Sequence, residues 1–137
     1  MQITIINQQK RIPISKRAIK AAVLKTLKIL RANLACEITI AYVDNRTIRE
    51  LNSRFLGKCQ ATDVLCFDLS RKGQLIADIV ISTQRAAENS RLFKTSPIWE
   101  SKLYLVHGIL HLFGWRDHRK KDRLRMHKKA LQIIKRI

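Results

Sequence analysis

Two hydrophobic patterns alternate along this chain, and together they predict strands and helices in alternation. Four short runs are rich in β-branched residues, which is typical of strands. These runs are residues 2–7, 37–43, 63–67 and 75–81. In the first predicted helix, apolar residues recur every three or four positions and therefore share one face. That face carries Ile19, Val23, Leu27, Leu30 and Leu34.

The middle of the chain contains start and stop signals for two further helices. Asp44 or Asn45 can cap a helix that ends near Gly57, and Ser82 or Thr83 can cap a short polar helix. Both caps follow directly on predicted strands, so the sequence predicts tight connections from strand to helix.

The most hydrophobic helix is predicted between Ser96 and Gly114. Ser96 is suited to the cap, Pro97 to the first position and Glu100 to the first turn. A final amphipathic helix is expected within residues 115–137. Its predicted apolar face consists of Leu124, Leu131, Ile134 and Ile137. The pattern as a whole predicts an α+β fold: a single domain over residues 1–137, with helices packed on a mixed four-stranded sheet.

The net charge narrows the choice of partners. The 28 Lys and Arg against 10 Asp and Glu give a formal charge of +18, while 46% of residues are hydrophobic, as in a globular domain. A polyanion that relieves this self-repulsion is therefore expected to bind; RNA, DNA and an anionic membrane are the candidates, and nucleic acid is favoured. No run approaches the ~18 apolar residues of a membrane-spanning helix. No membrane association and no second protein are predicted.

The cysteines indicate a reducing environment. Cys36, Cys59 and Cys66 are odd in number and form no C-x-x-C pair. Neither a disulfide framework nor a thiolate zinc site is therefore expected, and a cytoplasmic location is predicted.

The candidate chemistry lies in the predicted helix that ends at Gly114. His107 and His111 are four residues apart, so both imidazoles project from one helix face and can bind a single ion. A left-handed glycine can then turn the chain back, so that Asp117 or His118 supplies a third ligand. Three protein ligands leave a fourth position open, which is typical of a catalytic zinc site.

Two further residues refine this interpretation. Gly108 stands where the H-E-x-x-H metallopeptidases have a Glu as general base, so a peptidase of that mechanism is disfavoured. Glycine here instead predicts a tight approach to a helix or to a substrate backbone. His127, beside Lys128 and Lys129, is predicted to be a surface residue that can contact phosphate. Asp63 is expected to have a structural or supporting role.

These residues resemble the YbeY endoribonucleases, also called rRNA maturation factors. The family signature is similar to H-G-x-L-H-L-x-G-Y-D-H, and residues 107–114 match it without a gap. Residues 50–52, 57–58 and 62–65 resemble the E-L-N, G-K and T-D-V-L blocks of the family. Residues 77–82 resemble its G-D-I-V-I-S strand.

The chain departs from the family pattern at two positions. Asp117 stands where the family has its third histidine, and His118 follows one position later, so both stay candidate ligands. A carboxylate ligand would make the ion a weaker Lewis acid. Leu56 stands where the family usually has an arginine thought important for activity. Arg54, on the neighbouring turn, is a candidate to supply that charge.

The resemblance implies a single-strand-specific, zinc-dependent endoribonuclease with one Zn²⁺ per chain. Its implied role is 16S rRNA 3′-end maturation and ribosome quality control, with ribosomal RNA and the small ribosomal subunit as partners. The alternatives are a zinc-containing RNA-binding assembly factor with little catalysis and a small metallopeptidase. Arg54 and Arg116 are the candidate catalytic residues. The candidate RNA-binding residues beside the predicted ion are Arg116, Arg119, Lys120 and Lys121.

Overall fold

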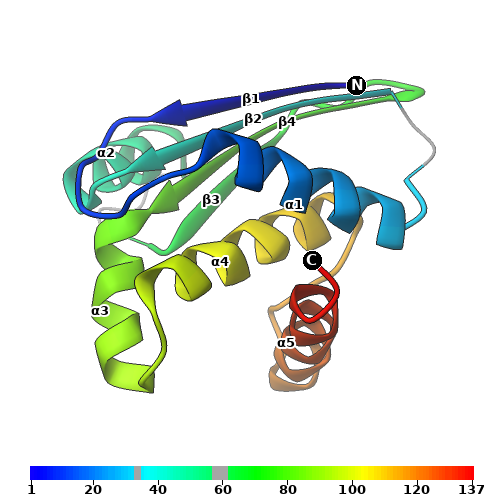
Figure 1. Ribbon diagram of the computed structural model, residues 1–137. Coiled ribbons are helices and arrows are strands. Elements are labelled where there is room, and N and C mark those ends of the chain that lie inside the picture. Colours follow the sequence, from blue (N-terminus) through cyan, green and yellow to red (C-terminus); the bar gives the residue numbers. More distant parts are fainter. Residues whose placement is uncertain (33–34, 57–61) are drawn as a thin grey trace.

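A four-stranded sheet with helices on both faces forms the fold (Figure 1). The computed structural model describes residues 1–32, 35–56 and 62–137. The predicted helix positions Leu34 and Gly57 lie outside these residues. The elements in chain order are β1 (Gln2–Asn7), α1 (Lys16–Ile29), β2 (Ala35–Val43), α2 (Asn45–Leu56), β3 (Val64–Asp68), β4 (Gln74–Ser82), α3 (Thr83–Phe93), α4 (Pro97–Leu112) and α5 (Lys120–Ile134).

The sheet is mixed, with strand order β1-β2-β4-β3. Strands β1, β2 and β4 run parallel, and β3 pairs antiparallel with β4. The turn between β3 and β4 contains Gly73, whose φ of +77° favours glycine. This arrangement confirms the predicted α+β fold with a mixed four-stranded sheet.

Alternation along the strands separates two hydrophobic layers. Ile79 and Ile81 of β4 face the larger core, which is shared with α1 and α4. Val80, between them, points to the other face and packs near Ile48 of α2. Helix α4 crosses the sheet beside α1, and α3 and α5 pack near its two ends (Figure 1). Helix α4 is thus buried along most of its length, which holds its side chains in place.

The start of α4 follows the predicted signals. Ser96 is the N-cap, and its Oγ accepts a hydrogen bond from the backbone N–H of Trp99 at 3.1 Å. Pro97 begins the helix, and Glu100 lies in its first turn. A carboxylate there interacts favourably with the positive end of the helix dipole. Among the described residues, no helix is long and apolar enough to cross a membrane.

The last helix buries a face that coincides only in part with the predicted one. Met126, Ala130 and Ile133 are buried in α5, whereas Leu124 is 62% exposed. Ala130 is fully buried, and Ile134 and Ile137 of the predicted face pack against the same core while partly exposed. The prediction weighted leucine and isoleucine, so it included the exposed Leu124 and missed Met126 and Ala130.

Candidate metal centre

A pocket of about 460 Å³ lies where the second half of α4 meets the start of β3 and the first turns of α5. Imidazoles and carboxylates dominate the polar part of its lining. The lining residues are Thr62, Asp63, Val64, His107, His111, Asp117, Arg123, Leu124, Met126 and His127. Five of them can act as metal ligands through nitrogen or oxygen atoms: Asp63, His107, His111, Asp117 and His127.

Two of these side chains come from α4 itself. His107 and His111 are one helical turn apart, and both line the pocket as their spacing predicts. Gly108 faces the sheet: a Cβ at this position would lie 3.0 Å from Cγ2 of Ile79. The carbonyl oxygen of Gly108 also accepts a hydrogen bond from the thiol of Cys66 at 3.4 Å. The expected tight approach is therefore present, but the neighbour is a strand rather than a helix or a substrate.

The end of α4 turns the chain back toward the pocket. Gly114 has a φ of +87°, and its N–H donates to the carbonyl oxygen of His111 at 3.1 Å. The N–H of Trp115 donates to the carbonyl oxygen of Leu110 at 3.1 Å, which completes a Schellman motif. Trp115 also packs against the core beneath the turn. The helix thus ends at the predicted glycine, and the residues after it fold back.

This turn brings Asp117 to the histidines. Oδ2 of Asp117 lies 3.4 Å from Nε2 of His111. Two donors bound to one tetrahedral zinc ion at ~2.0–2.2 Å are roughly 3.3–3.5 Å apart, so this separation suits a shared ion. His118 is exposed and does not line the pocket. Of the two predicted third ligands, the structure therefore brings Asp117, and not His118, to the histidine pair.

Arg123 holds the segment that carries Asp117. Its Nη1 donates to the carbonyl oxygen of His118 at 3.1 Å and lies 3.4 Å from that of Asp117. The backbone of this turn is therefore tied to α5 by a charged donor. His118 contributes its backbone to this contact, while its side chain faces away from the pocket lining.

His107 has an unusual electrostatic environment. Its Nε2 is buried without a hydrogen-bond partner, and no other buried side-chain nitrogen or oxygen among residues 1–32, 35–56 and 62–137 shares this condition. Burial lowers the pKa of His107. The charge of Asp63 acts in the opposite direction and raises this pKa, whereas His127 lowers it further. A neutral imidazole with a free lone pair is the form that binds a metal ion.

The donor set fits a divalent metal ion in its chemistry. A buried, unpartnered imidazole nitrogen costs free energy unless something binds it, and an ion at this pocket would satisfy it. Within the described part of the chain, no three His, Cys, Asp or Glu side chains are already close enough together to hold an ion. Binding of an ion would therefore require these side chains to move closer together.

The predicted cationic residues lie around this pocket rather than in it. Arg119 is the N-cap residue of α5, and Lys120 and Lys121 begin the helix; all three are exposed. Arg116 is also exposed and lines a neighbouring groove with Trp115 and Arg125. These side chains form a basic rim beside the turn that carries Asp117.

Arg54 is not brought to the pocket. It lies in the last turn of α2, and its guanidinium carbon is 5.5 Å from the ring centroid of Phe55. Phe55 in turn contacts Phe67 of β3 edge to face, at 5.8 Å between centroids. The side chain of Leu56, and residues Gly57 and Lys58, lie outside the described part of the structure.

Two pocket residues were missed by the sequence reasoning. Arg123 was not singled out, and His127 was interpreted as a surface residue. His127 is indeed exposed, but its ring lies 6.2 Å from that of His107. The available signal was the i, i+4 spacing of Arg123 and His127, which places both on one face of α5.

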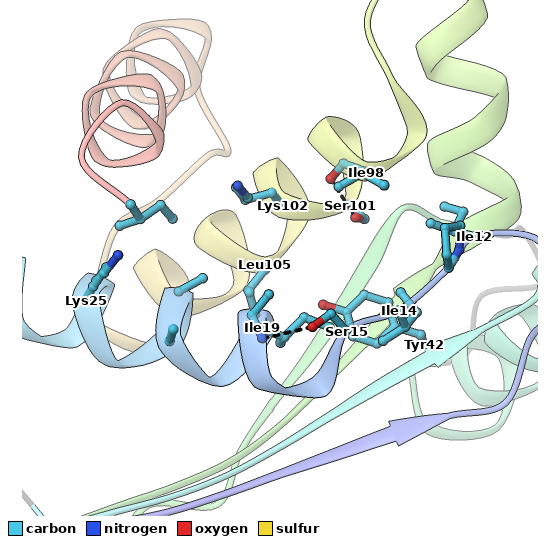
Figure 2. Close-up of a pocket in the computed structure, with 15 residues that line it drawn as sticks. Ile12, Ile14, Ser15, Ile19, Lys25, Tyr42, Ile98, Ser101, Lys102 and Leu105 are labelled. Atoms are coloured by element: carbon cyan, nitrogen blue, oxygen red, sulfur yellow. Dashed lines mark hydrogen bonds between the residues drawn. The ribbon is translucent and has the colours of Figure 1, made fainter.

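A second pocket differs from this one in chemistry. It has a volume of about 350 Å³ and lies between α1 and α4, with Ile19 and Leu105 facing each other and Lys25 and Lys102 at its edge (Figure 2). Its lining residues include no histidine, cysteine or carboxylate side chain. This pocket lacks the side chains that commonly bind metal ions, so the candidate metal site is the histidine pocket.

Comparisons with known proteins identify the relatives of this chain. The family model described as Endoribonuclease YbeY matches residues 4–137. The endoribonuclease YbeY of Caldicellulosiruptor saccharolyticus is 34% identical over 151 residues, which covers 98% of this chain and 96% of that protein. The endoribonuclease YbeY of an Anaeromyxobacter species is 41% identical over 102 residues, covering 72% of this chain and 53% of that protein. The solution structure of TM1509 from Thermotoga maritima superposes with a TM-score of 0.63 at 25% identity, covering 97% of this chain and 89% of that one.

Proposed function

Because the chain belongs to the endoribonuclease YbeY family, we propose that it cleaves single-stranded RNA with the help of a divalent metal ion, zinc in the first instance. The observation that carries this proposal is that His107, His111 and Asp117 line one pocket. Few structural roles explain an unpartnered buried imidazole nitrogen beside a second imidazole and a carboxylate.

In this proposal, His107, His111 and Asp117 hold one ion per chain. A zinc ion there supplies a Lewis acid that polarises a phosphoryl oxygen and lowers the pKa of water. His107 is suited to this role because burial keeps its imidazole neutral. Asp117 contributes negative charge to a strongly cationic surface, which favours a cation in the pocket.

The remaining residues bind and position the substrate. Arg116, Arg119, Lys120 and Lys121 are exposed on the turn and the first turn of α5, where they can contact successive phosphates of a flexible strand. Arg123 acts as a positioning residue, because its hydrogen bond to the carbonyl oxygen of His118 holds the turn that carries Asp117.

The proposed substrate is ribosomal RNA. The formal charge of +18 suits a large polyanion, and the basic rim lies beside the proposed ion. Within this proposal the protein acts on the small ribosomal subunit, in 16S rRNA 3′-end maturation and ribosome quality control, and works in the cytoplasm. A metallopeptidase is not favoured, because Gly108 occupies the place of the general base.

The test is cleavage of a labelled single-stranded RNA by a His107→Ala, His111→Ala double variant. We expect the parent to cleave, a chelator to stop cleavage, and zinc to restore it. The double variant should be inactive and hold no zinc, while circular dichroism reports an intact fold. His118→Ala is the matched control and should cleave like the parent.

Two outcomes would contradict the proposal. Cleavage by the double variant at the parental rate would remove these histidines from the reaction. An inactive parent that binds ribosomal RNA equally well with and without the two histidines would favour the assembly factor with little catalysis.

A further inference from the structure

His127 lies over the histidine pocket although it comes from a different helix. It projects from α5, and its ring centroid is 6.2 Å from that of His107, with the ring planes inclined by 64°. It lines the same pocket as His111 and Asp117. A third imidazole therefore reaches the proposed metal centre from the opposite side to α4.

The separation of the two rings suits a shared ion. Two imidazoles bound to one tetrahedral zinc at ~2.0–2.1 Å have ring centroids roughly 5 Å apart. The observed separation is only slightly larger, and a side-chain rotation of exposed His127 can close it. Inclined rings can direct nitrogen lone pairs to one point, which parallel stacked rings cannot do. The buried Nε2 of His107 has no competing partner in the protein.

The chemistry of the neighbouring residues also favours a neutral donor at this position. The turn after α4 brings the carboxylate of Asp117 to the pocket and not the imidazole of His118, so α4 and its turn place only two imidazoles there. An imidazole from α5 restores a set of three nitrogen donors without adding charge to the pocket. Three imidazoles are a common zinc-binding set.

We propose that His127 is a further protein ligand of the ion held by His107, His111 and Asp117. This inference rests on the metal site of the proposed function and names one more residue of it. The four donors come from α4, the turn after it and α5, so binding of the ion ties α5 to α4. An ion held by these residues would supply Lewis-acid chemistry to a bound phosphate.

The test compares zinc affinity in His127→Ala and His118→Ala, measured by competition with a chromophoric chelator. Both residues are exposed histidines close in sequence, but only His127 lines the pocket. Loss of an outer partner of a metal ligand already weakens binding about 10–100-fold, so loss of a ligand should weaken it at least about tenfold. His118→Ala should stay within about twofold of the parent. Circular dichroism verifies that both variants fold.

Cobalt substitution gives a second readout that does not depend on activity. With Co²⁺ alone, the visible absorption of His127→Ala should shift relative to the parent, and that of His118→Ala should not. Equal zinc affinities and equal cobalt spectra in the two variants would overturn the role of His127 while leaving the three-residue site intact. Parental zinc affinity in the His107→Ala, His111→Ala variant would instead overturn the proposed metal site, and the role of His127 with it.

Discussion

Replacing Gly108 by alanine tests how tightly α4 is held against the sheet. The new Cβ would lie 3.0 Å from Cγ2 and 3.3 Å from Cδ1 of Ile79, whose side chain is fully buried. In an open helix this substitution stabilises by about 1 kcal/mol, because alanine has the better helix propensity. Overpacking of a well-packed core costs about 1–3 kcal/mol. We therefore expect Gly108→Ala to lower the free energy of unfolding by up to about 2 kcal/mol.

A double-mutant cycle with Ile79→Ala separates the two effects. Ile79→Ala alone should cost about 2–5 kcal/mol through lost burial and a cavity. With the isoleucine shortened, the new Cβ of Gly108→Ala meets open space, so only the gain in helix propensity remains. In that background Gly108→Ala should stabilise by about 1 kcal/mol. The coupling between the two positions should therefore be about 1–3 kcal/mol.

Urea unfolding followed by circular dichroism measures all four proteins. Zinc affinity should fall in Gly108→Ala as well, because His107 precedes the shifted residue directly. If Gly108→Ala is about 1 kcal/mol more stable than the parent and shows no coupling to Ile79, the result contradicts a close contact between α4 and β4 at this position. The glycine would then have no packing role.

Three further predictions address the turn, the rim and the thiol. Gly114→Ala should cost about 1–2 kcal/mol in urea unfolding, because its φ of +87° disfavours a side chain; an unchanged midpoint would contradict the Schellman turn. In a Lys120→Gln, Lys121→Gln variant, the slope of log binding constant for RNA against log salt concentration should become shallower by about 1.4. The control Arg91→Gln on α3 should leave this slope unchanged. Equal slopes in the double variant and the parent would show that these lysines do not contact the RNA. Burial, with Asp68 and Asp78 adding to it, raises the pKa of the Cys66 thiol to about 12. The thiolate is therefore scarce near neutral pH, and iodoacetamide should label native Cys66 at least about tenfold more slowly than the urea-unfolded chain at pH 8.5; equal rates would refute the burial.

The elements of the fold were predictable because their signals are local. Alternating apolar residues predicted β2, and the Ser96-Pro97 pair and Gly114 predicted the two ends of α4. Each of these signals acts within a few residues through backbone hydrogen bonds and side-chain burial. The mixed sheet followed from the order of strands and helices. The buried face of α5 was predictable only in part, because Met126 and Ala130 become buried through the packing of α5 on α4.

The site was predictable only in part. The spacing of His107 and His111 reveals a shared helix face, and that inference needs no tertiary information. The choice between Asp117 and His118 depends on one residue of register in the turn after Gly114, which sequence spacing cannot decide. His127 comes near His107 only because α5 folds back along α4. Its position is a property of helix packing, and its lysine-rich neighbours gave no sign of it.

The packing of α5 has a consequence for the order in which the molecule opens. Helix α5 packs mainly on α4, and the sheet receives little direct support from it. The pocket spans this helix-to-helix contact, with His107 on one side and His127 on the other. Opening of α5 alone would therefore separate His127 from His107 while the sheet stays folded, and α5 amides should exchange with solvent more readily than those of β2 and β4. An ion bound across the contact would stabilise the closed form by mass action, so protection of α5 amides should rise with metal concentration while protection of β2 and β4 changes little.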